Sequence, residues 1–202
     1  MKNNRVWAAD KVETDPEYFE RLASIHEPEY LWIGCSDSRV PANEIVGLQP
    51  GELFVHRNIA NQAPPSDINV LAVVQYSVQV LKVKDIIITG HYGCGGIHAA
   101  FTKHDHGPLE AWLSHIRQLR SRYRAELSHC DQKVNENTLS ELNVKQQVYN
   151  VARIPIVQQA WKDGQELRIH GLIYNLEDGL LKDLGLTLNK ITHLPEEFRI
   201  IE

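Results

Sequence analysis

An unbroken apolar run around Ile86, Ile87 and Ile88 constrains the fold more than any other feature of this chain. The run is β-branched, stops at His91, and is too short for a helix. It also lacks the polar alternation of a strand with one solvated face, so it fits a strand covered on both sides. We expect that strand over residues 85–90, and further strands at 30–34, 52–56 and 167–174.

The segments between these strands carry helical periodicity. Apolar residues recur every three or four positions after an N-capping residue at 67–81, and a second stripe covers 109–119. Thr138 and Glu141 have the spacing of a capping box, which predicts that a helix begins there. Pro155 is expected to break or kink that helix.

Strands that alternate with helices imply a mostly parallel central β-sheet flanked by helices, and hence an α/β fold. The length of 202 residues fits a single domain over residues 1–202. Residues 1–28 are expected to form an N-terminal helical arm. Within it, residues 1–14 are polar, and a helix is predicted from Asp15 to about Ser24.

Composition excludes several classes of partner. The chain has 21 basic and 26 acidic residues, a net charge of -5, so nothing neutralises a phosphate backbone and nucleic acid is not an expected partner. No run of about 18 apolar residues is present, so no membrane span is expected. Three cysteines, an odd number, indicate a reducing compartment, and the expected location is the cytoplasm.

Residues that bind metals follow two of the expected strands. Cys35 and Asp37 come after the first strand, and His91 and Cys94 follow the isoleucine strand. The carboxyl ends of parallel strands meet at one edge of a sheet, so these four side chains can converge. Thiolate and imidazole donors suit tetrahedral Zn²⁺. The alternative is that the four residues only pack or cap turns.

Arg39 bears on whether such a zinc site is open to solvent. Two thiolates neutralise Zn²⁺, so the carboxylate of Asp37 would make the site negative and fill its fourth position. The guanidinium of Arg39 can hold that carboxylate away from the metal in a bidentate pair. Water can then bind, and zinc lowers the pKa of bound water towards about 7, which yields a hydroxide nucleophile.

These residues lie in two motifs, CSDSR at 35–39 and HYGCGG at 91–96, and through them the chain resembles a β-class carbonic anhydrase. The resemblance extends to the segments 32–34, 51–58 and 141–144, and so covers most of the chain. It implies one Zn²⁺ per chain, held by Cys35, Asp37, His91 and Cys94. It also implies that Asp37 and Arg39 form a dyad that gates the metal.

The resemblance further implies the reversible hydration of CO2 to bicarbonate and a proton, by attack of zinc-bound hydroxide. The backbone N–H of Gly95 would orient the substrate. Activity is expected to rise towards alkaline pH, because hydroxide competes with Asp37 for the metal. A homodimer, or a homotetramer built as a dimer of dimers, is expected, with the N-terminal arm packed on a neighbouring subunit.

A second resemblance concerns regulation. Trp32, Arg57 and Tyr76 match a triplet that holds bicarbonate at a non-catalytic site in a bacterial subtype of the family. The guanidinium would bind the anion, and the indole N–H and the phenol would donate further hydrogen bonds. Allosteric inhibition by bicarbonate is therefore expected. The alternative is that Trp32 belongs to the core and that Arg57 pairs with a carboxylate.

Two other functions compete with CO2 hydration. The first is hydrolysis of another linear electrophile, CS2 or COS, on the same scaffold. The second is a zinc-bound but non-catalytic protein that senses bicarbonate, with Asp37 permanently on the metal. Arg39 separates the second alternative from catalysis, because a purely structural four-ligand site does not need a partner that withdraws a carboxylate.

Overall fold

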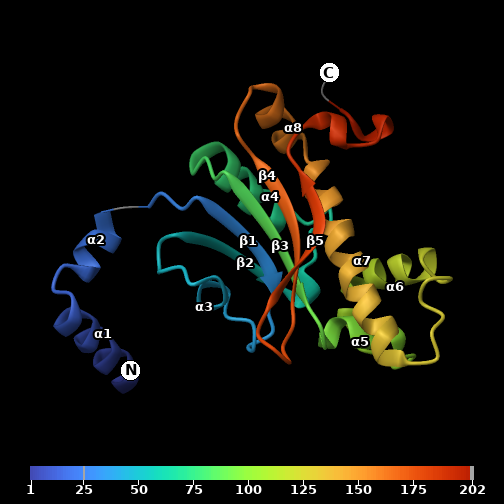
Figure 1. Cartoon of the computed structure of the whole chain (residues 1–202), viewed down its shortest axis with the longest axis horizontal. Coiled ribbons are helices and arrows are strands. Elements are labelled where there is room, and N and C mark those ends of the chain that lie inside the picture. The colour runs from blue at the N-terminus through green and yellow to red at the C-terminus, as the bar shows by residue number, and fades with distance from the viewer. Residues whose placement is uncertain (25, 201–202) are drawn as a thin grey trace.

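The computed structural model describes residues 1–24 and 26–200, and its centre is a five-stranded sheet (Figure 1). The strand order is β2-β1-β3-β4-β5, and the first four strands are parallel. This confirms the predicted α/β class and the mostly parallel sheet. The strands are β1 (Tyr30–Cys35), β2 (Leu53–Asn58), β3 (Asp85–His91), β4 (Arg168–Tyr174) and β5 (Leu181–Leu188).

The fifth strand, β5, was not predicted. It is antiparallel to β4 and lies at the edge of the sheet, where it carries exposed polar residues such as Lys182 and Asp183. An edge strand with one neighbour need not be apolar on both faces, so it lacks the continuous apolar run by which β1 and β3 were recognised.

The register of β1 and β3 determines where the functional residues meet. Gly34 of β1 pairs with Thr89 of β3, so Cys35 ends its strand beside the last two residues of β3, Gly90 and His91. Because the two strands are parallel neighbours, Cys35 and His91 leave the sheet at the same edge.

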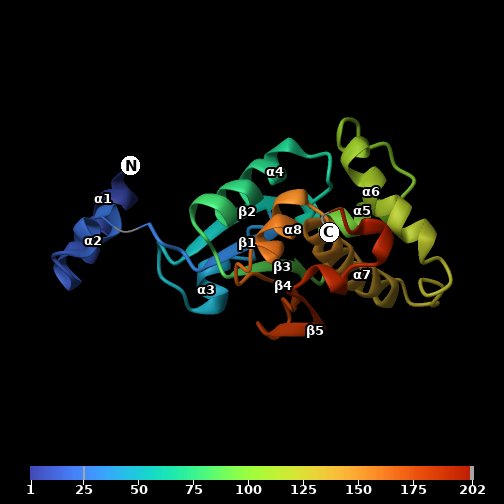
Figure 2. The ribbon, with the colours of Figure 1, turned by 90° about the horizontal axis from the view of Figure 1, so that it is seen from above.

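Helices cover the two faces of the sheet unequally (Figure 2). One face packs against four helical elements, and the core between them includes Leu31, Ile86 and Val148. On the other face, the short helix α3 (Ala42–Val46) packs near the buried indole of Trp32. The helices of the first face are α4 (Ile68–Gln75), its π-helical extension η2 (Tyr76–Val80), α7 (Gln132–Ala152) and α8 (Pro155–Lys162).

Two helices, α5 (Gly95–Phe101) and α6 (Leu109–Arg122), follow β3 and build a separate core beyond the end of the sheet. This core contains Cys35, Ala60 and Cys94. Three short 3-10 turns complete the elements: η1 (Ile59–Asn61), η3 (Ile191–His193) and η4 (Glu196–Phe198).

The predicted start of the long helix was wrong. Helix α7 begins at Gln132, because the side chain of Asp131 caps it by accepting from the backbone N–H of Lys133 at 2.8 Å. Thr138 lies inside the helix, where its hydroxyl donates to the carbonyl of Val134. The break at Pro155 is confirmed: α7 ends at Ala152, and the proline occupies the first turn of α8.

The N-terminal arm is helical, as expected. It consists of α1 (Lys2–Thr14) and α2 (Tyr18–Ser24), and the second helix begins later than the predicted Asp15. Helix α1 buries none of its residues and extends away from the sheet (Figures 1 and 2). Among the described residues, no helix is both long and apolar enough to cross a membrane.

Candidate metal centre

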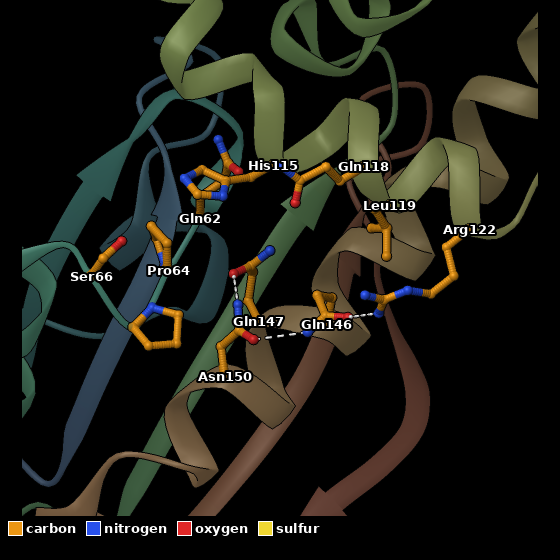
Figure 3. Close-up of a pocket in the computed structure, with 11 residues that line it drawn as sticks. Gln62, Pro64, Ser66, His115, Gln118, Leu119, Arg122, Gln146, Gln147 and Asn150 are labelled. Atoms are coloured by element: carbon orange, nitrogen blue, oxygen red, sulfur yellow. Dashed lines mark hydrogen bonds between the residues drawn. The ribbon is translucent and has the colours of Figure 1, made fainter.

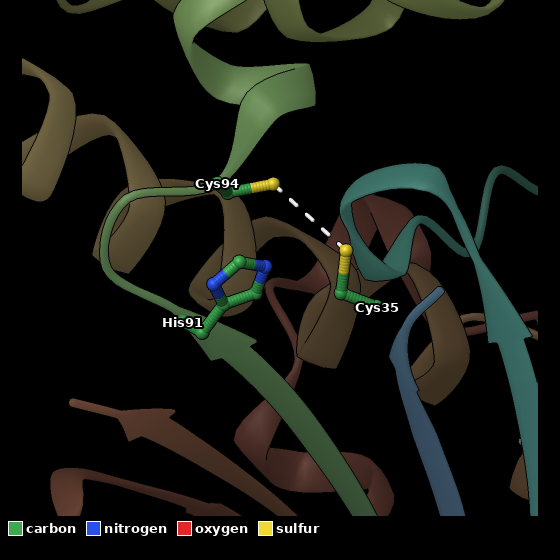
Figure 4. A group of neighbouring side chains, drawn as sticks. All are labelled: Cys35, His91 and Cys94. Carbon is green, nitrogen blue, oxygen red and sulfur yellow. Dashed lines mark hydrogen bonds between the residues drawn. The ribbon is translucent and has the colours of Figure 1, made fainter. Parts of the chain in front are cut away.

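Three of the four predicted metal ligands converge where β1 and β3 end (Figure 4). The ligand atoms of Cys35, His91 and Cys94 all lie within 4.8 Å of one another, and the two sulfurs are 3.9 Å apart. All three residues are buried. Cys35 and His91 end their strands, and the turn after β3 brings back Cys94, which caps helix α5.

The ring of His91 is oriented for metal binding. Its Nδ1 lies 3.0 Å from the carbonyl oxygen of Tyr92, an acceptor that fixes the proton on Nδ1. The other nitrogen, Nε2, is buried and has no hydrogen-bond partner among residues 1–24 and 26–200. A buried acceptor without a partner is costly in a folded protein, so this atom is suited to bind a metal ion.

The donor set fits zinc. Two Zn–S bonds of about 2.3 Å at the tetrahedral angle separate their sulfurs by about 3.8 Å, which matches the observed 3.9 Å between Cys35 and Cys94. Two thiolates and one imidazole are the soft donors that Zn²⁺ prefers, and three protein ligands leave a position for a fourth.

The two thiols also influence each other's protonation. The hydrogen bond between the two sulfurs, more than burial, determines the pKa of the Cys35 thiol and lowers it below its ordinary value. Donating that bond, together with burial, raises the pKa of Cys94. The protein alone therefore stabilises one thiolate of the pair, and a divalent cation bound between the sulfurs would stabilise the second.

The fourth predicted ligand, Asp37, lies beside the three-residue cluster and is bound to Arg39. The guanidinium donates to both carboxylate oxygens, from Nε at 2.9 Å and from a terminal nitrogen at 2.7 Å, and the Arg39 backbone N–H adds a third bond at 2.9 Å. These bonds, the guanidinium first, hold the pKa of Asp37 well below its usual range. One Asp37 oxygen is 3.7 Å from Nε2 of His91.

Arg57 fastens the backbone of the Asp37 loop. Its guanidinium donates to the carbonyl oxygen of Cys35 at 2.8 Å and to that of Asp37 at 2.6 Å. Two of its nitrogens are therefore used within the protein. This role was not predicted, because sequence spacing does not show which carbonyls an arginine will reach.

The predicted bicarbonate triplet does not form one site within the chain. Trp32 pairs with Val55 in the β1–β2 register and is buried on the α3 face of the sheet. Tyr76 lies against Phe54, with ring centroids 5.8 Å apart, and Phe54 packs into the core of the opposite face. Phe54 and Val55 are adjacent in β2, and adjacent residues of a strand point to opposite faces of the sheet. Trp32 lies on the face of Val55 and Tyr76 on the face of Phe54, so the sheet separates the two residues.

Gly95 begins helix α5, directly after the ligand Cys94. A Cβ atom at this position would meet no atom of the described part of the chain within 4 Å, so the approach to its backbone is open. Arg39, Tyr92 and Gly93 line a nearby cavity of about 300 Å³, whose far wall comes from α7 and the loop after β4.

A hydrogen-bonded group that includes Tyr92, the residue after His91, was also not predicted from the sequence. The hydroxyl of Tyr92 donates to Glu141 of α7, and Lys182 of β5 donates to the same Glu141 oxygen at 2.7 Å. Burial, followed by the Glu141 carboxylate, raises the pKa of Tyr92. The only signal in the sequence was that both Tyr92 and Glu141 belong to the segments of family resemblance.

Comparison with known proteins agrees with this geometry. The family model described as "Carbonic anhydrase" matches residues 30–181. A carbonic anhydrase of Emericella nidulans is 48% identical over 187 residues, which cover 92% of this chain and 82% of the relative. A carbonic anhydrase of Saccharomyces cerevisiae is 35% identical over 198 residues, covering 94% of this chain and 88% of the relative.

Solved structures extend the likeness to the whole fold. The β-carbonic anhydrase of Coccomyxa, in complex with acetazolamide, superposes with a TM-score of 0.90 at 38% identity, covering 95% of this chain and 87% of that one. One of two tetrameric β-carbonic anhydrases of Sordaria macrospora gives 0.89 at 38% identity, covering 93% and 95%. Together with the buried Cys-His-Cys cluster at two strand ends, these matches show that the chain belongs to the β-class of carbonic anhydrases.

Proposed function

We propose that this protein catalyses the reversible hydration of CO2 to bicarbonate and a proton with one zinc ion per chain. The observation that carries the proposal is the buried cluster of Cys35, His91 and Cys94, with an unpartnered Nε2 on His91 and an arginine-held carboxylate beside it. Zinc, when bound there, would acidify a water molecule and so supply a nucleophile for CO2 near neutral pH.

The residues around the cluster have distinct roles in this proposal. Asp37 is the fourth protein donor, and Arg39 withdraws it by binding both of its oxygens. Arg57 keeps the Asp37 loop in place through two backbone carbonyls. The Gly95 N–H is open to solvent-borne substrate and would donate to an oxygen of CO2 or bicarbonate.

The test is stopped-flow CO2 hydration combined with metal analysis, on the parent and on Asp37→Asn. We expect about one zinc per chain in both proteins, as in single catalytic sites, and a large loss of activity in the variant. Asp10→Asn, which neutralises an exposed carboxylate of the arm, is the matched control and should keep the parental rate. A parent without stoichiometric zinc, or an Asp37→Asn variant as active as the parent, would refute the proposal.

The pH profile tests the gate separately. Hydroxide and the Asp37 carboxylate compete for the same position on the metal, and hydroxide becomes more abundant as pH rises. The rate of CO2 hydration should therefore climb towards alkaline pH. Metal content must stay constant across the range for the comparison to hold. A rate that is flat from mildly acidic to alkaline pH would contradict the gate while leaving the zinc site intact.

The two alternatives remain distinguishable. A non-catalytic bicarbonate sensor would keep Asp37 on the metal and show background turnover at alkaline pH with zinc fully loaded, but here the carboxylate is bound to Arg39. Hydrolysis of CS2 or COS would use the same cluster, and a direct comparison of CO2 hydration with CS2 hydrolysis decides between them.

Three further features belong to the proposal. A homodimer or homotetramer is supported by the exposed apolar residues of the arm. A cytoplasmic location is supported by the adjacent free thiols, which need a reducing compartment, and cell fractionation tests it. Inhibition by bicarbonate stays a prediction, and its three residues do not meet within one chain.

A further inference from the structure

A strained turn touches all the chain segments that carry the cysteine and histidine ligands. Ala60 and Asn61 of η1 are buried and have φ angles of 62° and 47°, in the left-handed region that L-residues rarely adopt. The turn follows Asn58, whose carbonyl accepts from the N–H of Ser36, next to Cys35. Consecutive left-handed residues persist only where their surroundings hold them, and they concentrate at functional sites.

The same turn also lies against the other two ligand segments. A Cβ atom on Gly90, just before His91, would be 3.3 Å from the side-chain oxygen of Asn61. A Cβ atom on Gly96, two residues after Cys94, would be 3.2 Å from the Cβ of Ala60. Ala60 itself packs in the small core that contains both cysteines.

Helix α7 holds this turn through buried amides. Asn143 donates to the carbonyl of Ala60 at 2.8 Å and accepts from Gln147 at 2.9 Å. Gln147 in turn accepts from the backbone N–H of Ala63 at 2.9 Å, so the helix binds the chain both within the turn and just after it. Asn143 and Gln147 are only 1% and 4% exposed.

The amide chain continues outward in a single direction (Figure 3). Asn150 donates to Gln147 at 2.8 Å, Gln146 donates to Asn150 at 2.8 Å, and the chain begins with the guanidinium of Arg122, 3.1 Å from Gln146. The outer members line a pocket of about 180 Å³ between α6 and α7. Each amide donates to the next one inward and accepts from the one before it, so the chain is polarised from a cation towards the Ala60 carbonyl.

We propose that Asn143 and Gln147 are positioning residues of the metal centre: they hold the strained Ala60–Asn61 turn against the segments that carry Cys35, His91 and Cys94. This inference rests on the proposed zinc site. It predicts that an amide on α7, which touches no ligand atom, controls how firmly the ion is retained.

The experiment measures the rate at which zinc-loaded protein releases zinc to an excess of chelator, alongside melting temperature. Asn143→Leu should release zinc about 10-fold faster than the parent, the lower end of the range by which outer-shell partners change metal affinity. Asn143→Asp is a second variant for the case that leucine prevents folding. It keeps the acceptor for Gln147 but cannot donate to Ala60, and its release should also be faster.

A rescue distinguishes positioning from general destabilisation. Glycine adopts the left-handed region without strain, so Ala60→Gly added to Asn143→Leu should return zinc release towards the parental rate. The matched control is Gln158→Leu, which removes a fully buried amide on α8 that bonds Phe198 and Ile200. It should lower the melting temperature without faster release.

The outcomes separate this inference from the proposed function. A parent that binds no stoichiometric zinc overturns the proposed function itself. A zinc-loaded parent whose Asn143 variants release zinc at the parental rate overturns only the positioning role. Equal acceleration by Gln158→Leu, or no rescue by Ala60→Gly, also overturns it.

Discussion

Arg39 is the residue on which the proposed carboxylate gate depends. Arg39→Met removes both guanidinium bonds to Asp37 and leaves only the bond from the backbone N–H, so the carboxylate can turn towards His91, whose Nε2 is 3.7 Å away. We expect full zinc content but CO2 hydration slowed about 100-fold, the scale of a misplaced group in a catalytic site.

Arg39→Lys is the control for charge alone. Lysine keeps the cation but cannot form the two-pronged pair, so its rate should lie between those of the parent and of Arg39→Met. Stopped-flow rates normalised to zinc content make the comparison. A methionine variant as fast as the parent would show that Arg39 does not govern Asp37.

At the scale of single residues, the sequence predicted the metal ligands better than it predicted the residues that hold the ligand segments in place. Cys35, His91 and Cys94 follow two buried strands, and parallel strand ends meet, so their convergence could be inferred. Asn143 and Ala60 are 83 positions apart and of unspecific type, and only the packing of α7 on the sheet brings them together. Tyr76 was paired with Trp32 through the family resemblance alone, and the two residues lie on opposite faces of the sheet within one chain.

At the scale of elements, helix α7 packs closely against β3, the strand that ends at His91. Gly90 allows it, since a Cβ atom there would lie 2.7 Å from a methyl carbon of Val144. We expect Gly90→Ala to lower the free energy of unfolding by about 1–3 kcal/mol, because the added methyl overpacks the interface. Thermal unfolding at fixed protein concentration measures the change.

A double variant tests the cause of that loss. Val144→Ala removes the opposing methyl groups, so Gly90→Ala should cost less in the Val144→Ala background than in the parent. Additive losses from the two substitutions would show that the methyl contact is not the reason.

Asp85 joins β3 to β4 at the other end of the strands. Burial raises its pKa, but hydrogen bonds from Arg168 at 2.6 and 2.8 Å and from His170 at 2.8 Å outweigh burial and lower it below the usual range. The unfolded chain therefore binds the proton more readily, so this contribution to stability is present above about pH 4 and is lost as pH falls below it.

Asp85→Asn should show that dependence directly. At neutral pH we expect the variant to be about 1–2 kcal/mol less stable, a value reduced for the partly exposed Arg168, and the difference should shrink as pH falls from 5 to 3. Melting temperatures across this range, with Asp10→Asn as control, measure the effect. A constant difference at every pH would contradict it.

Whole elements were predictable where one periodicity dominates. The apolar runs of β1 and β3 and the proline at the α7–α8 break gave correct assignments, because burial on both faces and a missing backbone N–H leave few alternatives. The capping-box spacing at Thr138 predicted the wrong start for α7, because a helix begins after its first effective N-cap, which here is Asp131. Helix α7 was therefore expected too late.

At the scale of the whole molecule, the N-terminal arm has too few contacts within its own chain. Helix α1 has 13 residues and buries none of them, and Val6, Trp7 and Val12 are 53%, 45% and 44% exposed. An isolated helix of fewer than about 15 residues is marginal in water, so tertiary contacts must stabilise it. Within the arm, Phe19 of α2 packs on Trp7, with ring centroids 5.7 Å apart.

A second copy of the chain would cover this apolar surface, so the arm should govern assembly. We expect the parent to be a dimer or tetramer by light scattering after size exclusion, and deletion of residues 1–24 to shift it to smaller species at the same concentration. Trp7→Ser keeps the arm but removes its largest exposed side chain, and should weaken association in the same direction to a smaller extent. A monomeric parent, or a truncated chain with an unchanged number of subunits, would show that the exposed residues of α1 are not an interface.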